Sequence, residues 1–130
     1  MDKKPALALN LVEEFVGVSH GNFARVKEML AAEPALVNAT WDWGGGDFET
    51  ALGAAAHMGN KQIANYLLER GAPLDIFAAA MLDMIEVVKA GLDARPEMLH
   101  TPGPHGIPLI VHAEAGDAKA VLEYLNSLTK

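Results

Sequence analysis

Apolar residues recur along the chain at fixed offsets from four turn positions, Gly21, Gly59, Asp83 and Gly116, which serve here as anchors. Apolar side chains stand five and nine residues after each anchor, so the two positions lie four apart, on one face of a helix. The position nine residues after the anchor holds leucine in every copy: Leu30, Leu68, Leu92 and Leu125. The pattern predicts one helix after each anchor.

A second, shorter pattern precedes each anchor. Three residues before the anchors, the side chains are apolar and mostly small: Val18, Ala56, Ala80 and Ala113. Small side chains predict a short helix that its neighbours approach closely. Each copy therefore predicts a short helix, a turn and a longer helix, and the chain as a whole predicts four such units stacked in an all-α repeat fold.

The intervals between anchors are unequal, at 38, 24 and 33 residues. The extra residues of the first interval fall in 40–48, where Gly44, Gly45 and Gly46 follow two tryptophans, and they predict an enlarged loop or hairpin. The short second interval predicts that the third unit lacks a projecting turn. The third interval contains residues 100–108, whose three prolines and two glycines exclude a helix and predict a rigid, extended connection.

The second unit carries a resemblance to a known family. Residues 50–60 read Thr-Ala-Leu-Gly-Ala-Ala-Ala-His-Met-Gly-Asn, which resembles the Thr-Pro-Leu-His-x-Ala-Ala-x-x-Gly-His segment of ankyrin repeats. Residues 63–72 resemble the second helix and Gly-Ala ending of that repeat, and the fourth unit repeats part of the pattern at 106–117. Two features depart from it: Gly53 and Ile110 replace the first-helix histidine, and Asp83 replaces the turn glycine.

The resemblance covers about residues 12–127 and implies one domain over 1–130. The expected fold is an ankyrin-type helix-turn-helix solenoid of four helix pairs, with an enlarged loop or hairpin finger at 40–48. The expected units are about 12–39, 49–75, 76–100 and 106–127.

The same resemblance implies a protein–protein interaction module that binds its partner through a concave face and the Trp-rich loop. Aromatic side chains are common anchors at interfaces, and two tryptophans and Phe48 stand within 41–48. Two structural alternatives stay open for these aromatic residues: covering the end of the first unit, or filling the gap left in the third unit. The expected partner-binding residues are Trp41, Trp43, Asp47, Phe48, Glu49, His57, Met58 and Glu114.

Residues 42–57 are also compatible with a different function. A carboxylate beside a histidine can perform acid–base chemistry, and Asp42, Asp47 and Glu49 lie near His57 in sequence. A small-molecule or catalytic pocket between the Trp-rich loop and the shortened third unit is therefore the alternative hypothesis. Acidic residues just before Thr50 are more typical of a helix start than of a catalytic site, so the chain is expected not to be an enzyme.

Three further histidines do not form a convincing metal-binding pattern in the sequence. His100, His105 and His112 flank or follow the proline segment and could supply three imidazoles to a metal, but their spacing does not support one. His112 replaces a small residue of the other units and is expected to be a hydrogen-bonded core or capping group. No nucleotide-binding or nucleophile motif is present. The sequence therefore predicts no metal and no cofactor.

Composition narrows the partner class. Ten Lys and Arg against seventeen Asp and Glu give a net charge of −7, which disfavours nucleic acid and anionic membranes. The chain has no cysteine, which excludes disulfides and thiolate metal sites. We expect a cytoplasmic protein, monomeric apart from weak self-association through its end units, that binds a basic or donor-rich protein surface.

Overall fold

The computed structural model describes residues 4–129, and this part of the chain is mostly helical. Eight α-helices follow one another within it: α1 (Leu9–Val18), α2 (Phe23–Ala32), α3 (Ala51–His57), α4 (Lys61–Glu69), α5 (Ile76–Met81), α6 (Ile85–Ala94), α7 (Leu109–Ala115) and α8 (Lys119–Leu128). Strands β1 (Thr40–Asp42) and β2 (Phe48–Thr50) and the 3-10 turns η1 (Pro34–Asn38), η2 (Pro96–Leu99) and η3 (Pro104–Gly106) connect them. None of the described helices has the length and apolar character to cross a membrane.

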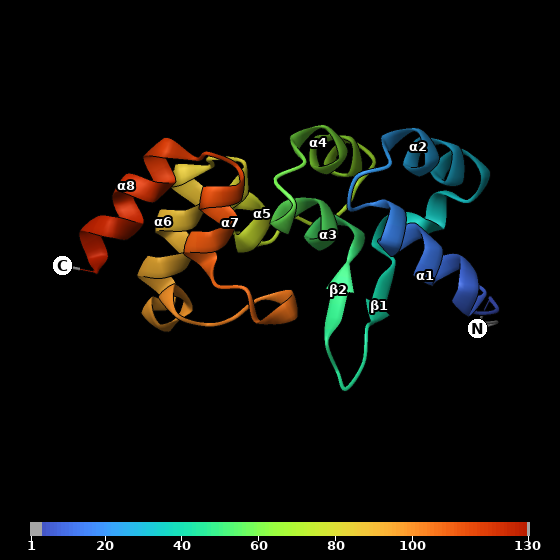
Figure 1. Cartoon of the computed structure of the whole chain (residues 1–130), viewed down its shortest axis with the longest axis horizontal. Helices are drawn as coiled ribbons and strands as arrows, with labels where there is room; N and C mark the ends of the chain where they lie inside the picture. The colour runs from blue at the N-terminus through green and yellow to red at the C-terminus, as the bar shows by residue number, and fades with distance from the viewer. Residues whose placement is uncertain (1–3, 130) are drawn as a thin grey trace.

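Consecutive helices pack against each other as α1 with α2, α3 with α4, α5 with α6 and α7 with α8. The first helices of the pairs also stack, because α3 contacts both α1 and α5, and α5 contacts α7 (Figure 1). They are shorter than their partners in the last three pairs, whereas α1 is as long as α2. The two ends of the chain lie at opposite ends of this row, and the hairpin projects from the side of α1 and α3 (Figure 1). The mostly helical, repeat-like character expected from the sequence is confirmed.

The small residues expected in the first helices permit this stacking. Every residue of α3 from Ala51 to Ala56 is buried, and so are Ala78, Ala79 and Ala80 of α5. Buried side chains form two clusters, one centred on the first two helix pairs and one on the last two. Ala78 and Met81 belong to the first cluster, whereas Ala79 and Ala80 belong to the second, so α5 joins the two cores.

Three of the four turns between paired helices use a left-handed residue, and at two of them it is the anchor; the first anchor, Gly21, does not have a positive φ. Gly59 and Asp83 have φ angles of 66° and 60°. In the fourth unit the left-handed residue is Asp117, with a φ of 49°, whereas Gly116 lies in the ordinary region at −91°. Gly116 serves close approach instead, since a Cβ there would come within 1.9 Å of the Met81 carbonyl oxygen.

The predicted enlarged loop is a β-hairpin. Strands β1 and β2 pair in antiparallel register, with Trp41 opposite Glu49 and Asp42 opposite Phe48. The Asp42 carboxylate accepts hydrogen bonds from the backbone N–H groups of Gly44 and Gly46 at 2.8 and 3.0 Å. The three glycines all have positive φ, a conformation that other residues rarely adopt, so this tight tip depends on them.

The proline-rich connection forms no α-helix, as predicted, and it runs back towards the hairpin. It follows the 3-10 turn η2 and is not extended throughout as expected, because the 3-10 turn η3 interrupts it and contacts β2 (Figure 1). His105, with a φ of 61°, forms the middle of η3, and its backbone N–H donates to Asp47 Oδ1 at 2.8 Å. This contact brings together residues 58 positions apart in the sequence.

Candidate functional site

Four titratable side chains meet beside the hairpin, although they come from separate parts of the chain. Glu49 lies on β2, His57 ends α3, His20 lies in the turn after α1, and His105 lies on η3. One potential ligand atom of each lies within 4.8 Å of those of the other three. We refer to these four residues as the His–Glu cluster.

Glu49 is the centre of the His–Glu cluster and is only 1% exposed. Alternation along β2 turns its side chain inward, while Phe48 and Thr50 face solvent. Its Oε1 accepts a hydrogen bond from Trp43 Nε1 at 2.9 Å and lies 3.3 Å from His20 Nε2. Its Oε2 lies 3.0 Å from His57 Nδ1 and 3.1 Å from His105 Nε2.

Two of the histidines, His20 and His105, are held by acceptors on the side away from Glu49, whereas His57 Nδ1 lies 3.3 Å from the Gly53 carbonyl oxygen as well as 3.0 Å from Glu49 Oε2. His20 Nδ1 lies 2.9 Å from the Gly17 carbonyl oxygen and 3.1 Å from that of Val16, both on its own helix. His105 Nδ1 lies 2.6 Å from Asp47 Oδ2. In both rings the Nδ1 atom faces an acceptor, and Nε2 faces Glu49.

The three imidazole rings are also packed against one another. His57 stands between the other two, with its ring centroid 5.0 Å from that of His20 and 5.2 Å from that of His105, at nearly perpendicular interplanar angles. Trp43 completes the arrangement, edge-on to His20 at 6.2 Å. The Glu49 carboxylate is therefore covered by four rings.

Charges in the His–Glu cluster shift two pKa values. Burial alone would lower the pKa of His105, but the hydrogen bond that its ring donates to Asp47 and the negative charges of Glu49 and Asp47 outweigh it, so the pKa is raised. The backbone N–H and the side chain of His105 in turn lower the pKa of Asp47. The pair is thus stabilised with a positive imidazole and a negative carboxylate.

The comparison with known families identifies part of this region. The family model described as ankyrin repeat matches residues 47–79. The chain contains an ankyrin repeat. Neither the curated proteins nor the solved structures give a match to the chain. The ankyrin repeat begins on the hairpin, includes α3 and α4, and ends within α5, so it contributes Glu49 and His57 to the cluster but neither His20 nor His105.

The eight residues expected to bind a partner divide into two groups around the ankyrin repeat. Trp41 packs against the first core cluster, and Trp43, Asp47, Glu49 and His57 take part in contacts of the His–Glu cluster. Phe48 and Met58 are 60% and 55% exposed, and Glu114 is exposed on α7. Trp43 is also 39% exposed, Trp41, Asp47 and His57 are half-buried, and Glu49 alone among the eight is buried.

Sequence reasoning missed His20 and His105 as members of the site. A weak signal for His20 was present, because it directly precedes the first anchor, close to the position that His57 holds before the second. The sequence groups His105 with His100 and His112, but among the described residues it joins His20 and His57 instead. His112 is a core residue, as expected: it is 1% exposed and its Nδ1 lies 3.0 Å from the Pro108 carbonyl oxygen.

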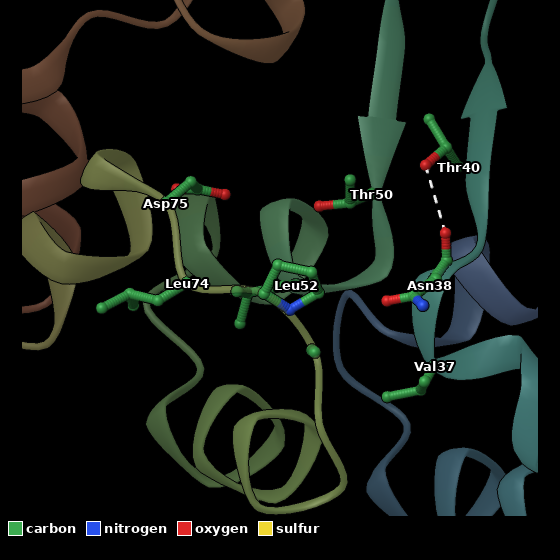
Figure 2. Close-up of a pocket in the computed structure, with 9 residues that line it drawn as sticks. Val37, Asn38, Thr40, Thr50, Leu52, Leu74 and Asp75 are labelled. Carbon is green, nitrogen blue, oxygen red and sulfur yellow. Dashed lines mark hydrogen bonds between the residues drawn. The ribbon is translucent and has the colours of Figure 1, made fainter.

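A separate hollow of about 320 Å³ lies between the base of the hairpin and the segment that leads from the ankyrin repeat's α4 into α5. Figure 2 shows Thr40 and Thr50 on one side of it and Leu74 and Asp75 on the other, with Leu52 between them. This is the region where the sequence predicts a missing turn. Its lining is mostly apolar and includes neither His57 nor Glu49.

Proposed function

We propose that the chain is a protein-binding module of four ankyrin-type helix pairs, with units at about 12–39, 49–75, 76–100 and 106–127. An ankyrin repeat indicates a protein–protein interaction module, and the match at residues 47–79 is the basis for this assignment. The observation that carries the proposal is the exposure of two large apolar side chains, Phe48 and Met58, within that repeat. Exposed apolar side chains on a binding surface lose contact with water when a partner covers them.

The proposed binding surface consists of Phe48 on the hairpin, Met58 at the end of α3, and Glu114 near the end of α7. The ends of α3 and α7 are neighbours, because a Cβ on Gly59 would meet the Ala115 carbonyl oxygen at 2.2 Å. Exposed acidic groups and the net charge of −7 favour a partner surface rich in Lys and Arg.

The tryptophans have a supporting role in this proposal. Trp43 donates its indole N–H to Glu49, and Trp41 packs against the core, so both hold the hairpin against the helices. Their substitution would disturb the hairpin as well as any interface. Phe48 and Met58 are better probes because their exposed side chains contribute little to the core.

A double variant tests the proposed surface. We expect Phe48→Ser with Met58→Ser to weaken partner binding about tenfold or more, because each lost apolar anchor costs on the order of 1 kcal/mol or more. Partners are captured from lysate of the source cells on immobilised wild-type chain, and the affinity of each captured protein is then measured for wild type and variant. Unchanged melting temperatures would show that the variant folds.

The matched control is Val87→Ser, which removes an exposed apolar side chain from α6, the second helix of its pair. We expect it to leave affinity unchanged. Equal loss in the control and the double variant would contradict the proposed surface.

One observation favours the alternative, a small-molecule site: the hollow in Figure 2 lies between the hairpin and the shortened third unit, where that hypothesis places it. Its lining lacks the expected His57, Glu49 and aromatic residues. If the wild-type chain captures no specific partner, this alternative replaces the proposed function.

A further inference from the structure

We propose that His20, Glu49, His57 and His105 form a binding site for one divalent transition-metal ion, with Zn²⁺ the best match to the ligand set. The spacing of His100, His105 and His112 along the chain does not predict a metal site, and of these three only His105 belongs to the cluster. Three further observations support the proposal: the directions of the ring nitrogens, the burial of Glu49, and the distances between ligand atoms.

The ring nitrogens are arranged so that lone pairs face the carboxylate. In a neutral imidazole one nitrogen carries the proton and the other carries a lone pair. Because Nδ1 of His20 and of His105 faces an oxygen acceptor, the proton belongs on Nδ1 and the lone pair on Nε2. The two Nε2 atoms then lie 3.3 and 3.1 Å from the Glu49 oxygens, so a cation is needed between each nitrogen and the carboxylate. In the metal-free chain a proton on the imidazole fills this role, and a bound metal ion would replace it.

Glu49 supplies the second observation. Its carboxylate is fully buried, and Oε2 has no hydrogen-bond partner among the described residues despite two imidazole nitrogens at 3.0 and 3.1 Å. The ion-pair contacts that the described part of the chain gives Glu49 are all with histidines. A buried charge is costly unless it is paired or binds a metal, so this carboxylate requires a cation from the cluster or from solvent.

The distances between the imidazole nitrogens and the Glu49 oxygens are close to those between ligands of one tetrahedral metal ion. Nitrogen and oxygen atoms bonded to zinc at about 2.0–2.1 Å in a tetrahedron lie about 3.3–3.4 Å apart. The three nitrogens lie 3.0–3.3 Å from the Glu49 oxygens, close to that separation. Three imidazoles and one carboxylate favour Zn²⁺, Co²⁺ or Ni²⁺ over Mg²⁺ and Ca²⁺, which prefer oxygen ligands.

The outer contacts are those that metal-binding histidines use. The Asp47 carboxylate orients His105, and the Gly17 carbonyl orients His20, leaving Nε2 of each directed inward. The histidine side chains retain 28%, 13% and 30% exposure for His20, His57 and His105, so an ion can reach them from solvent.

The test uses the full-length chain without a histidine tag, freed of metal by chelation and titrated with Zn²⁺ and, for its visible spectrum, Co²⁺. We expect saturation at one ion per chain and a tetrahedral Co²⁺ spectrum. His105→Gln and Glu49→Gln should each weaken binding about 100-fold or more, because each removes a direct ligand and the loss of an outer contact alone costs about 10–100-fold.

The matched control is His100→Gln, which removes an exposed histidine outside the cluster. It should leave affinity unchanged. Asp47→Asn provides a second, milder variant, since its partly exposed carboxylate contacts His105 but is not a ligand; about 10–100-fold weaker binding is expected. His105→Gln decides the question if Glu49→Gln fails to fold, because His105 is a surface residue.

Three outcomes would overturn the proposal. They are a folded chain that binds neither Zn²⁺ nor Co²⁺ at one ion per chain, binding undiminished in His105→Gln, or a loss in His100→Gln equal to that in His105→Gln. The first would show that protons on the histidines alone neutralise Glu49. The other two would place the ion elsewhere on the chain.

Discussion

Glu49 is a charged residue that favours contact with water, yet the fold buries its side chain. Its neighbours Phe48 and Thr50 are exposed, and an isolated glutamate between them would be expected to point outward to water. Strand alternation places it inward instead, opposite Trp41, where Trp43 and three histidines surround it. Desolvation of a carboxylate costs several kcal/mol, so these partners are needed for the hairpin to remain in place.

His112 provides a residue-scale prediction on pH. Burial lowers its pKa below the ordinary value of 6.5 more strongly than the Pro108 carbonyl and Asp75 raise it. Below pH 6.5 the unfolded chain therefore binds a proton that the folded chain excludes, and stability falls as pH falls through the folded pKa. Above about pH 7.5 this residue contributes no pH dependence, because it is neutral in both states.

We expect His112→Asn, which can still donate to Pro108, to reduce the slope of unfolding free energy against pH as the pH falls below 6.5. The reduction is at most about 1.4 kcal/mol per pH unit, the value for one proton. Urea unfolding of metal-free wild type and variant across this range measures it. An identical slope in both proteins would contradict the assignment of a lowered pKa to His112.

Individual residues of the site were partly predictable. Glu49 and His57 stand eight positions apart within the best-matching repeat, and both were expected to matter, though for partner binding. His20 and His105 were missed because their positions depend on loop paths. His105 reaches the cluster only through the left-handed turn of η3 in the proline segment, which no helical or strand periodicity describes.

At the scale of elements, the turn between α5 and α6 forms a hydrogen bond with α8 of the next helix pair. Asp83 adopts the left-handed conformation that glycine usually provides, and its Oδ1 accepts a hydrogen bond from the backbone N–H of Val121 at 2.9 Å. That N–H belongs to the first turn of α8, whose own preceding residue, Ala118, offers no capping side chain. The departure from the turn glycine thus gives α8 its cap.

We expect Asp83→Gly to release this cap, because glycine adopts the turn but has no acceptor. The hydrogen bond is worth about 1 kcal/mol, so the Val121 amide should exchange with deuterium about fivefold faster by NMR. Asp83→Asn retains an acceptor and tolerates the turn, and it should exchange at nearly the wild-type rate. Equal exchange in wild type and Asp83→Gly would show that Asp83 does not cap α8.

Elements were the most predictable scale, for a physical reason. Apolar positions at helical spacing describe burial on one face, and each of the four long second helices was expected from that spacing alone. The fourth turn was placed one residue early, at Gly116, because glycine suits both a left-handed turn and a close contact. The structure uses Gly116 for contact and Asp117 for the turn.

For the molecule as a whole, stability depends on how closely neighbouring units approach. The carbonyl oxygen of Met81 at the end of α5 occupies the space that a side chain on Gly116 would need. The two core clusters meet through α5, so a shift at this point separates the last helix pair from the others.

Gly116→Ala is therefore expected to destabilise the chain by about 1–3 kcal/mol or more, because its Cβ would overlap backbone that cannot rotate away. Its φ of −91° suits alanine, so the cost comes from the overlap alone. Gly21→Ala is the control, since nothing lies within 4 Å of a Cβ there. A similar melting temperature for the two variants would contradict the tight stacking of α5 and α7.

The contact between His105 and Asp47 links positions 58 residues apart, and this separation has a consequence for the order of folding. Closing a loop of that length costs chain entropy, so this contact is expected to form late. During synthesis Glu49 leaves the ribosome long before His105 does. A chain ended before residue 105 would still contain its ankyrin repeat but would lack the third imidazole, so the cluster can be completed only after the first three helix pairs have been synthesised.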